Sequence, residues 1–108
     1  MGRVPRLTIP YVESLDDLGV VPGSDRARAV AATVRQIATA SELPIAGDAE
    51  GPLPARTALR VEQLEGRRLL TAFARRVVGH RLWLWYRPRG SDRFDLVALT
   101  SAPPSNGN

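Results

Sequence analysis

The stretch HRLWLWYRPRGSDRFDLVALT, His80 to Thr100, decides the expected fold, because two short apolar segments flank one turn in it. The segment HRLWLWYR is rich in aromatic residues and is too short for a typical helix between Gly79 and Pro88. PRGSD is rich in turn residues, and RFDLVALT has the composition of a second strand. The stretch therefore predicts a β-hairpin with a loop of about four or five residues. Both strands are apolar on both faces near their middles, which is typical of interior strands.

Alternation along the first strand divides its side chains between two faces. One set is mostly apolar and is typical of a core under helices: His80, Leu82, Leu84 and Tyr86. The other set combines two indoles with two guanidinium groups: Arg81, Trp83, Trp85 and Arg87. Three interpretations of the second set stay open. It can stack bases and bind phosphates, it can bind a partner's peptide, or its tryptophans are core and its arginines extend along them to water.

Length and composition favour one globular domain over residues 1–100, followed by a frayed tail at 101–108. The chain has 108 residues, 44% of them hydrophobic and 24% charged, which is ordinary for a folded domain. It contains no cysteine and one histidine, so disulfides and cysteine- or histidine-rich metal sites are excluded. We expect no metal and no cofactor.

The charge is unevenly distributed along the chain. All fifteen basic residues are arginine. Residues 1–54 contain five arginines and seven acidic residues, net −2, whereas residues 55–108 contain ten arginines and four acidic residues, net +6. The basic C-terminal half suits contact with nucleic acid or with an acidic protein segment. No apolar run has the length of a signal peptide or a membrane span, so we expect a cytoplasmic protein that contacts no membrane.

Four further segments complete the expected architecture. Leu7, Ile9 and Tyr11 alternate in a short edge strand, and SDRARAVAATVRQIATAS, residues 24–41, has a helical apolar stripe after an N-cap serine. Residues 42–55 form a proline- and glycine-rich loop of open function, and residues 55–65 are helical. Residues 68–78 fit either a helix or a strand.

The C-terminal half, residues 64–100, resembles that of the RelE/ParE toxin superfamily, closest to its YoeB-like branch. The matching positions are Leu64 and Gly66, Phe73, Arg75-Arg76-Val77, His80-Arg81-Leu82 and Leu96 to Thr100. The resemblance implies a small α+β fold, β-α-α-β-β-β, with two helices packed on an antiparallel sheet and a strand at Phe73–Val78. From the residues alone, an αα-hairpin joined to a β-hairpin stays open as an alternative.

The resemblance also implies a function, that of the toxin-like component of a type II toxin–antitoxin pair. A small acidic antitoxin would cover the Arg/Trp face, and the target would be ribosome-bound messenger RNA or DNA gyrase. In ribonuclease members, arginines hold the scissile phosphate while the 2′-hydroxyl attacks. Arg81 and Arg76 match those positions and are the expected catalytic residues. The expected binding residues are Arg75, Trp83, Trp85 and Arg87.

The chain departs from the family where acid–base catalysis is expected. The ribonucleases usually have a histidine or tyrosine just after the last strand, where this chain has Ser101-Ala102-Pro103-Pro104. The carboxylate expected after the second helix has no clear counterpart, since Arg67 and Arg68 stand there. General acid–base catalysis needs a titratable group within reach. Endoribonuclease activity therefore stays open beside two alternatives, a non-enzymatic module that binds protein or nucleic acid and a dimer formed through the tryptophans.

Overall fold

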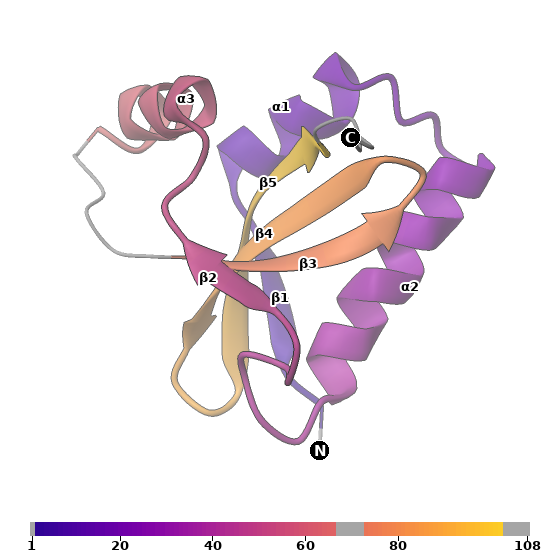
Figure 1. Ribbon diagram of the computed structural model, residues 1–108, viewed down its shortest axis with the longest axis vertical. Coiled ribbons are helices and arrows are strands. Elements are labelled where there is room, and N and C mark those ends of the chain that lie inside the picture. The colour runs from indigo at the N-terminus through magenta and orange to yellow at the C-terminus, as the bar shows by residue number, and fades with distance from the viewer. Residues whose placement is uncertain (1, 67–72, 103–108) are drawn as a thin grey trace, which may run out of the picture.

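The computed structural model describes residues 2–66 and 73–102, which form three helices and one five-stranded mixed sheet. In chain order the elements are β1 (Val4–Leu7), α1 (Ile9–Asp17), α2 (Asp25–Thr39), β2 (Ala49–Gly51), α3 (Ala55–Glu65), β3 (Phe73–Gly79), β4 (Leu82–Arg89) and β5 (Arg93–Ser101). The strands are arranged in the order β1-β5-β4-β3-β2, with β1 parallel to β5 and the other neighbours antiparallel. Figure 1 shows α2 and α3 on opposite sides of this sheet.

A small α+β fold is thus confirmed, but its details differ from the expected order. Two elements, α1 and β2, are additional to the expected β-α-α-β-β-β sequence. The sheet is mixed rather than antiparallel, because β1 pairs in parallel with the last strand of the chain. The alternative of an αα-hairpin joined to a β-hairpin is wrong, since all five strands belong to one sheet.

The N-terminal strand is shorter than its alternating pattern predicts. Thr8 ends it by capping α1, because its Oγ1 accepts a hydrogen bond from the Tyr11 N–H at 3.3 Å. Pro10 then lies in the first helical turn, where its missing N–H costs nothing. The prediction that Ile9 and Tyr11 continue the strand is therefore wrong. Tyr11 instead faces the core from α1 with 4% exposure.

The two predicted helices are confirmed. Ser24 caps α2 through its Oγ, which accepts a hydrogen bond from the Ala27 N–H at 3.1 Å, and Val30 and Ile37 are buried on its inner side. The helix α3 ends at Gly66, whose φ of 73° is the left-handed conformation in which glycine is favoured. Residues 67–72 lie outside the described residues, and they include the start of the segment 68–78, for which helix and strand were both open. From Phe73 onward that segment is a strand.

The proline-rich loop 42–55 contributes the edge strand β2, which its sequence did not predict. Ala49, Glu50 and Gly51 pair with Arg75, Ala74 and Phe73 of β3. The strand is three residues long and has no apolar pattern of its own, so its pairing depends on β3.

The predicted hairpin forms the interior of the sheet. Strands β4 and β5 pair from Leu82↔Ser101 to Arg89↔Arg93, and β5 ends at Ser101, inside the predicted tail. The pairing shifts between Trp85↔Ala98 and Tyr86↔Leu96, which leaves Val97 as an extra residue in β5. This bulge places Val97 and Ala98 in the same buried cluster.

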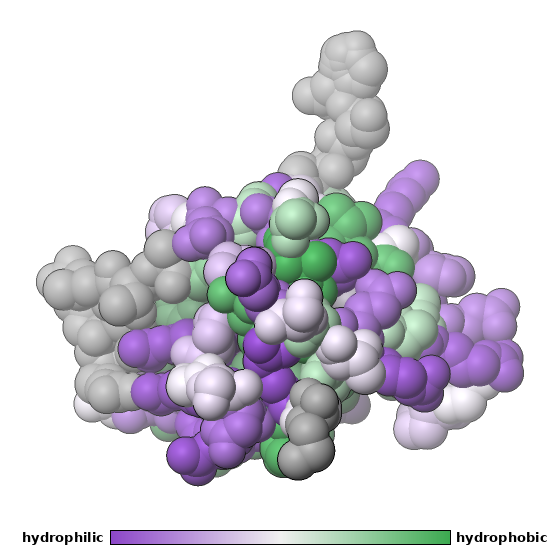
Figure 2. Space-filling model, turned by 90° about the horizontal axis from the view of Figure 1, so that it is seen from below, coloured by the Kyte–Doolittle hydropathy of each residue, from purple (hydrophilic) through white to green (hydrophobic). Residues whose placement is uncertain are grey.

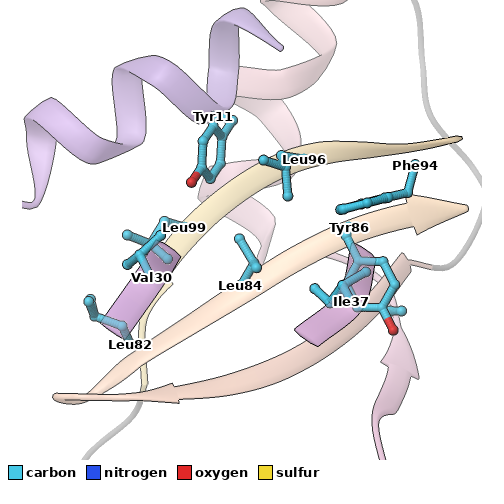
Figure 3. Close-up of a cluster of buried hydrophobic side chains, with 10 residues drawn as sticks. Tyr11, Val30, Ile37, Leu82, Leu84, Tyr86, Phe94, Leu96 and Leu99 are labelled. Atoms are coloured by element: carbon cyan, nitrogen blue, oxygen red, sulfur yellow. The ribbon is translucent and has the colours of Figure 1, made fainter. Parts of the chain in front are cut away.

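Two apolar cores lie on the two faces of the sheet. Figure 3 shows the larger one under α1 and α2, where most of the buried side chains are aliphatic or aromatic: Tyr11, Val30, Ile37, Ala74, Leu82, Leu84, Tyr86, Phe94, Leu96 and Leu99. The smaller core lies under α3 and contains Leu53, Val61, Phe73, Trp85, Val97 and Ala98. The surface seen from below Figure 1 is mostly hydrophilic with some hydrophobic residues in its middle (Figure 2). Within the described residues, no helix has the length and apolar character needed to cross a membrane.

Candidate functional site

The strand β4 separates its side chains largely as alternation predicts. Leu82 and Leu84 are fully buried in the core under α1 and α2, and Trp85 lies in the core under α3. Arg87 follows Trp85 on the second face, because the extra residue of the bulge belongs to β5 and leaves β4 regular. The second face of β4 is thus the face that carries the tryptophans and Arg87.

Arg81 and His80 do not lie on either strand face. They form the tight turn between β3 and β4, with φ values of 61° and 53°, and both side chains are exposed. Two residues with positive φ are typical of the type I′ turn, whose twist matches that of the flanking strands. The expectation that Arg81 shares a surface with Trp83 and Trp85 is therefore wrong. The sequence HR gave little sign of this turn, because arginine rarely adopts positive φ and histidine, although enriched there, adopts it only in a minority of cases.

Trp85 is a core residue. Its side chain is 3% exposed, and its Nε1 donates a hydrogen bond to Thr100 Oγ1 at 2.9 Å. Trp83 is half-buried at the rim of the same cluster, with the two ring centroids 6.3 Å apart and the planes at 75°. Such edge-to-face packing is a favourable arrangement of aromatic rings. The interpretation as core thus holds for Trp85, whereas Trp83 remains partly open to solvent.

Arg75, from the paired arginines of β3, completes the aromatic surface. Its guanidinium carbon lies 3.7 Å from the centroid of the Trp83 ring and 5.8 Å from that of Trp85. This is cation–π geometry. Its Nε is buried and has no hydrogen-bond partner among residues 2–66 and 73–102. That buried atom is out of reach of a ligand, but the terminal nitrogens of Arg75 also form no hydrogen bond within the described residues and can donate to an incoming acceptor.

Four further arginines surround one carboxylate on the same face of the sheet. Asp95 is 5% exposed, and it accepts hydrogen bonds from Arg6 Nε at 3.0 Å and from Arg89 Nε at 2.9 Å. Arg87 is the register partner of Asp95, and Arg93 that of Arg89. Burial acts to raise the pKa of Asp95, but the hydrogen bonds and charges of its arginine partners lower it more, so the pKa lies below its ordinary value. Asp95 thus binds two of these four arginines, and Arg93 has a second, exposed carboxylate, that of Asp92, beside it.

We call the resulting surface the arginine–tryptophan face; it consists of Arg6, Arg75, Trp83, Arg87, Arg89 and Arg93. Arg87 forms no ion pair within the described residues, and the side chain of Arg93 is 72% exposed beside Asp92 at 3.7 Å. Sequence reasoning found Arg75, Trp83 and Arg87. It missed Arg6, Arg89 and Arg93. The parallel pairing of β1 with β5 that brings Arg6 to this face has no local signature, whereas alternation continued to Arg89 and along β5 was a signal that could have found the other two.

Arg76 lies on the opposite face of the sheet and holds the 42–55 loop. Its Nη1 donates to Asp48 Oδ1 at 2.8 Å and its Nε donates to Gln36 Oε1 at 3.2 Å. The Tyr86 hydroxyl donates to the other oxygen of Asp48 and accepts from the Ile45 N–H at 3.3 Å. Burial and the hydrogen bond to Asp48 raise the pKa of Tyr86. These contacts give Arg76 a structural role.

No acid–base pair lies on the arginine–tryptophan face within the described residues. The two titratable groups that the sequence offered are elsewhere, with His80 in the exposed turn and the Tyr86 hydroxyl bound to Asp48 on the other face. The buried carboxylate on this face, Asp95, is bonded to two arginines that lower its pKa, and Asp92 beside Arg93 is exposed. Residues 2–66 and 73–102 contain no group of three or more potential metal ligands. The face can bind anions and stack rings, which is a binding chemistry.

Comparison with known proteins identifies no relative, since no family model, no curated protein sequence and no solved structure matches the chain.

Proposed function

We propose that this protein binds RNA through its arginine–tryptophan face and acts as the toxin-like component of a toxin–antitoxin pair that inhibits translation. The observation that carries the proposal is the Arg75 guanidinium stacked on Trp83, on the same face as four arginines that surround one buried carboxylate. Arginine binds phosphate through parallel hydrogen bonds, and an open indole ring stacks on bases of any sequence.

The geometry of the face favours a single strand over a duplex. Trp83, Arg87 and Arg89 project from one side of β4, and the last lies six positions after the first. At about 3.3 Å per residue they span about 20 Å along the strand. A single-stranded backbone lying along β4 would present phosphates to the arginines at one end and a base to Trp83 at the other. In a duplex the bases are paired and stacked, which keeps them from the indole.

The toxin-like part of the proposal rests on the resemblance of residues 64–100 to the RelE/ParE superfamily. It is supported by the helices α2 and α3, which lie where the two helices were expected, and by the three consecutive antiparallel strands that follow them and carry most of these arginines. The expected β-α-α-β-β-β order would then correspond to β1, α2, α3, β3, β4 and β5, with α1 and β2 as additions. A small acidic antitoxin that covers the same basic face would neutralise the protein.

We propose that the protein inhibits translation by occupying the RNA and not by cleaving it, because the arginine–tryptophan face offers arginines without an acid–base pair. Arg75 takes the place that the resemblance assigned to Arg81 and Arg76 as the arginine that contacts the phosphate. A general base for the 2′-hydroxyl would have to come from the ribosome or from the RNA itself.

Binding to a protein target, such as DNA gyrase, is the second candidate. It is favoured by Val77, which is 68% exposed and pairs in register with Trp83 on the same face. An aromatic residue and an arginine next to an exposed aliphatic side chain are the composition of a protein interface.

Inducible expression followed by cell-free assays tests the proposal. We expect growth arrest that Arg75→Ala and Arg87→Ala relieve, while Arg35→Ala, on the exposed side of α2, does not. Cell-free translation should stop with messenger RNA intact by primer extension. Cleaved transcripts would show a ribonuclease, and loss of DNA supercoiling with normal translation would favour gyrase. Harmless expression of folded protein to high yield would contradict a toxin of either kind.

A further inference from the structure

An apolar groove of about 360 Å³ lies between α1, α2 and β1, on the side of the sheet opposite to the arginine–tryptophan face. Its walls are almost entirely aliphatic and include Leu7, Leu15, Val20, Ala27, Ala31 and Val34. We propose that this groove, the α1–α2 groove, binds an amphipathic helix of a partner protein whose polar side is acidic. The inference stands independently of the proposed function, because the two surfaces share no residue.

One exposed large hydrophobic residue, Leu7, lines this groove, and another, Val21, is next in sequence to Pro22, which also lines it. Single exposed aliphatic residues are common on protein surfaces, but exposed aliphatic residues that adjoin an apolar groove enlarge its apolar surface. Leu7 is 57% exposed although it also lines the groove, so the apolar surface continues from the groove to its rim.

The edge of β1 disfavours an added strand as the occupant. The Val4 N–H bonds to the Asp92 carbonyl oxygen of the β4–β5 turn at 2.9 Å, so the backbone of Val4 points into the sheet. The next residue, Pro5, therefore occupies the outward position and has no N–H to offer. Proline at such a position protects a sheet edge against further pairing. The partner must then be held by side-chain packing.

The shape of the α2 wall suits a helix. Ala27 and Ala31 are one turn apart and face the groove, and such small side chains allow the axes of two packed helices to approach closely. Val34 continues the same stripe into the next turn. A partner helix with apolar residues at positions i, i+3, i+4 and i+7 would fill the groove in the usual helix-in-groove mode.

Charge decides the chemistry of the partner's polar side. Arg28 and Arg35 are two turns apart on the exposed flank of α2, next to the stripe of Ala31. Arg28 is paired with Asp25 at 2.9 Å, but both side chains are more than two-thirds exposed, so this pair is weak and can exchange partners. At the end of α1, Asp16 and Asp17 do not line the groove, and Asp17 lines a separate pocket next to α3. Acidic residues of the partner would therefore lie over α2, which also sets the rotation of the partner helix.

The test uses a synthetic amphipathic peptide of about 18 residues, long enough to form a helix, with leucines on one side and glutamates on the other. Fluorescence anisotropy should show saturable binding to the full chain. We expect Ala31→Glu to weaken it at least about tenfold, since a buried carboxylate would meet the apolar stripe. Arg35→Glu should weaken it as well. Ala32→Glu, on the same helix but outside the groove, is the matched control and should bind as the original chain does.

A second measurement, which needs no substituted protein, follows the amide chemical shifts of the parent chain during titration with the peptide. Changes confined to residues of β1, α1 and α2 support binding in the groove, and changes confined to β3 and β4 overturn the proposal. Equal affinity for a peptide with lysines in place of the glutamates overturns the acidic partner. A doubled mass in light scattering that Ala31→Glu abolishes would show that a second copy of this chain fills the groove instead. RNA binding by Ala31→Glu stays normal if the two surfaces are independent.

Discussion

The guanidinium carbon of Arg75 lies 3.7 Å from the centre of the Trp83 ring, although the register pairs Arg75 with Trp85 and Trp83 with Val77. The contact is therefore diagonal across two strands, and it uses the length of the arginine side chain. It joins the paired-arginine segment of the sequence to its tryptophan segment. The first test of the surface is to break this one contact.

Replacement of Arg75 by alanine should weaken binding to single-stranded RNA and lower the slope of log K against log salt by about 1, as expected for one lost phosphate contact. Arg75→Lys keeps the charge but loses the planar stacking group, so its affinity for RNA should lie between that of the parent protein and that of Arg75→Ala. Fluorescence anisotropy at several salt concentrations measures both effects. Arg35→Ala removes one arginine from the opposite side of the sheet and should leave the affinity nearly unchanged. An equal loss for Arg35→Ala and Arg75→Ala would mean that net charge alone binds RNA.

The carboxylate of Asp95 should contribute to stability in a way that depends on pH. Its pKa in the folded protein lies below the ordinary value of about 3.9, so the charged form stabilises the fold. We expect Asp95→Asn to lower the free energy of unfolding by about 1–3 kcal/mol at pH 7, where the parent carboxylate is ionised. The difference should shrink as the pH falls below 4 and vanish below the pKa of the folded state. Urea titrations of both proteins across this range measure it, and a difference that persists at the lowest pH would contradict an ionic origin.

The Tyr86 hydroxyl should hold the loop before β2. Tyr86→Phe removes the donor to Asp48 and the acceptor of the Ile45 N–H, leaving a nearly buried carboxylate with one partner fewer. We expect the free energy of unfolding to fall by about 1–3 kcal/mol and the Ile45 amide to exchange its hydrogen faster. Tyr11→Phe is the matched control, because the Tyr11 hydroxyl has no hydrogen bond within the described residues while its burial raises its pKa. Similar losses in both variants would indicate that packing, not the hydrogen bonds, is responsible.

The β3–β4 turn should be a point of backbone strain. His80 and Arg81 both have positive φ, which is unfavourable for side chains with a Cβ. The double substitution H80N/R81G provides the residues that a type I′ turn favours, and should raise the free energy of unfolding by about 1–2 kcal/mol. Ser91→Gly, in the β4–β5 turn, adds flexibility where no positive φ requires it and should not stabilise the protein.

The same double variant tests the part played by Arg81. Because Arg81 lies in the turn and not on the arginine–tryptophan face, H80N/R81G should bind RNA as the parent does. Loss of RNA binding in a folded, stabilised variant would show that Arg81 contacts RNA and that the binding surface includes the end of the β3–β4 hairpin.

Elements whose signals are local could be predicted from the amino-acid pattern alone. The cap at Ser24, the end of α3 before Gly66 and the alternation of Leu82 to Arg87 depend on near neighbours in the chain, and each was predicted correctly. Apolar residues on both faces of the last two strands also indicated their interior position, because a strand covered on both sides needs them.

Which arginines share a surface depends on long-range pairing that no local pattern predicts. Arg6 and Asp95 are 89 residues apart in sequence and meet because β1 pairs with β5, and Arg75 reaches Trp83 because of the register between β3 and β4. The turn at His80 and Arg81 removed a predicted site residue from the face, since the tight closure of the hairpin outweighs the strand preference of its sequence. Strand order, register and turn type follow from the packing of the whole sheet, and short-range pattern carries little information about them.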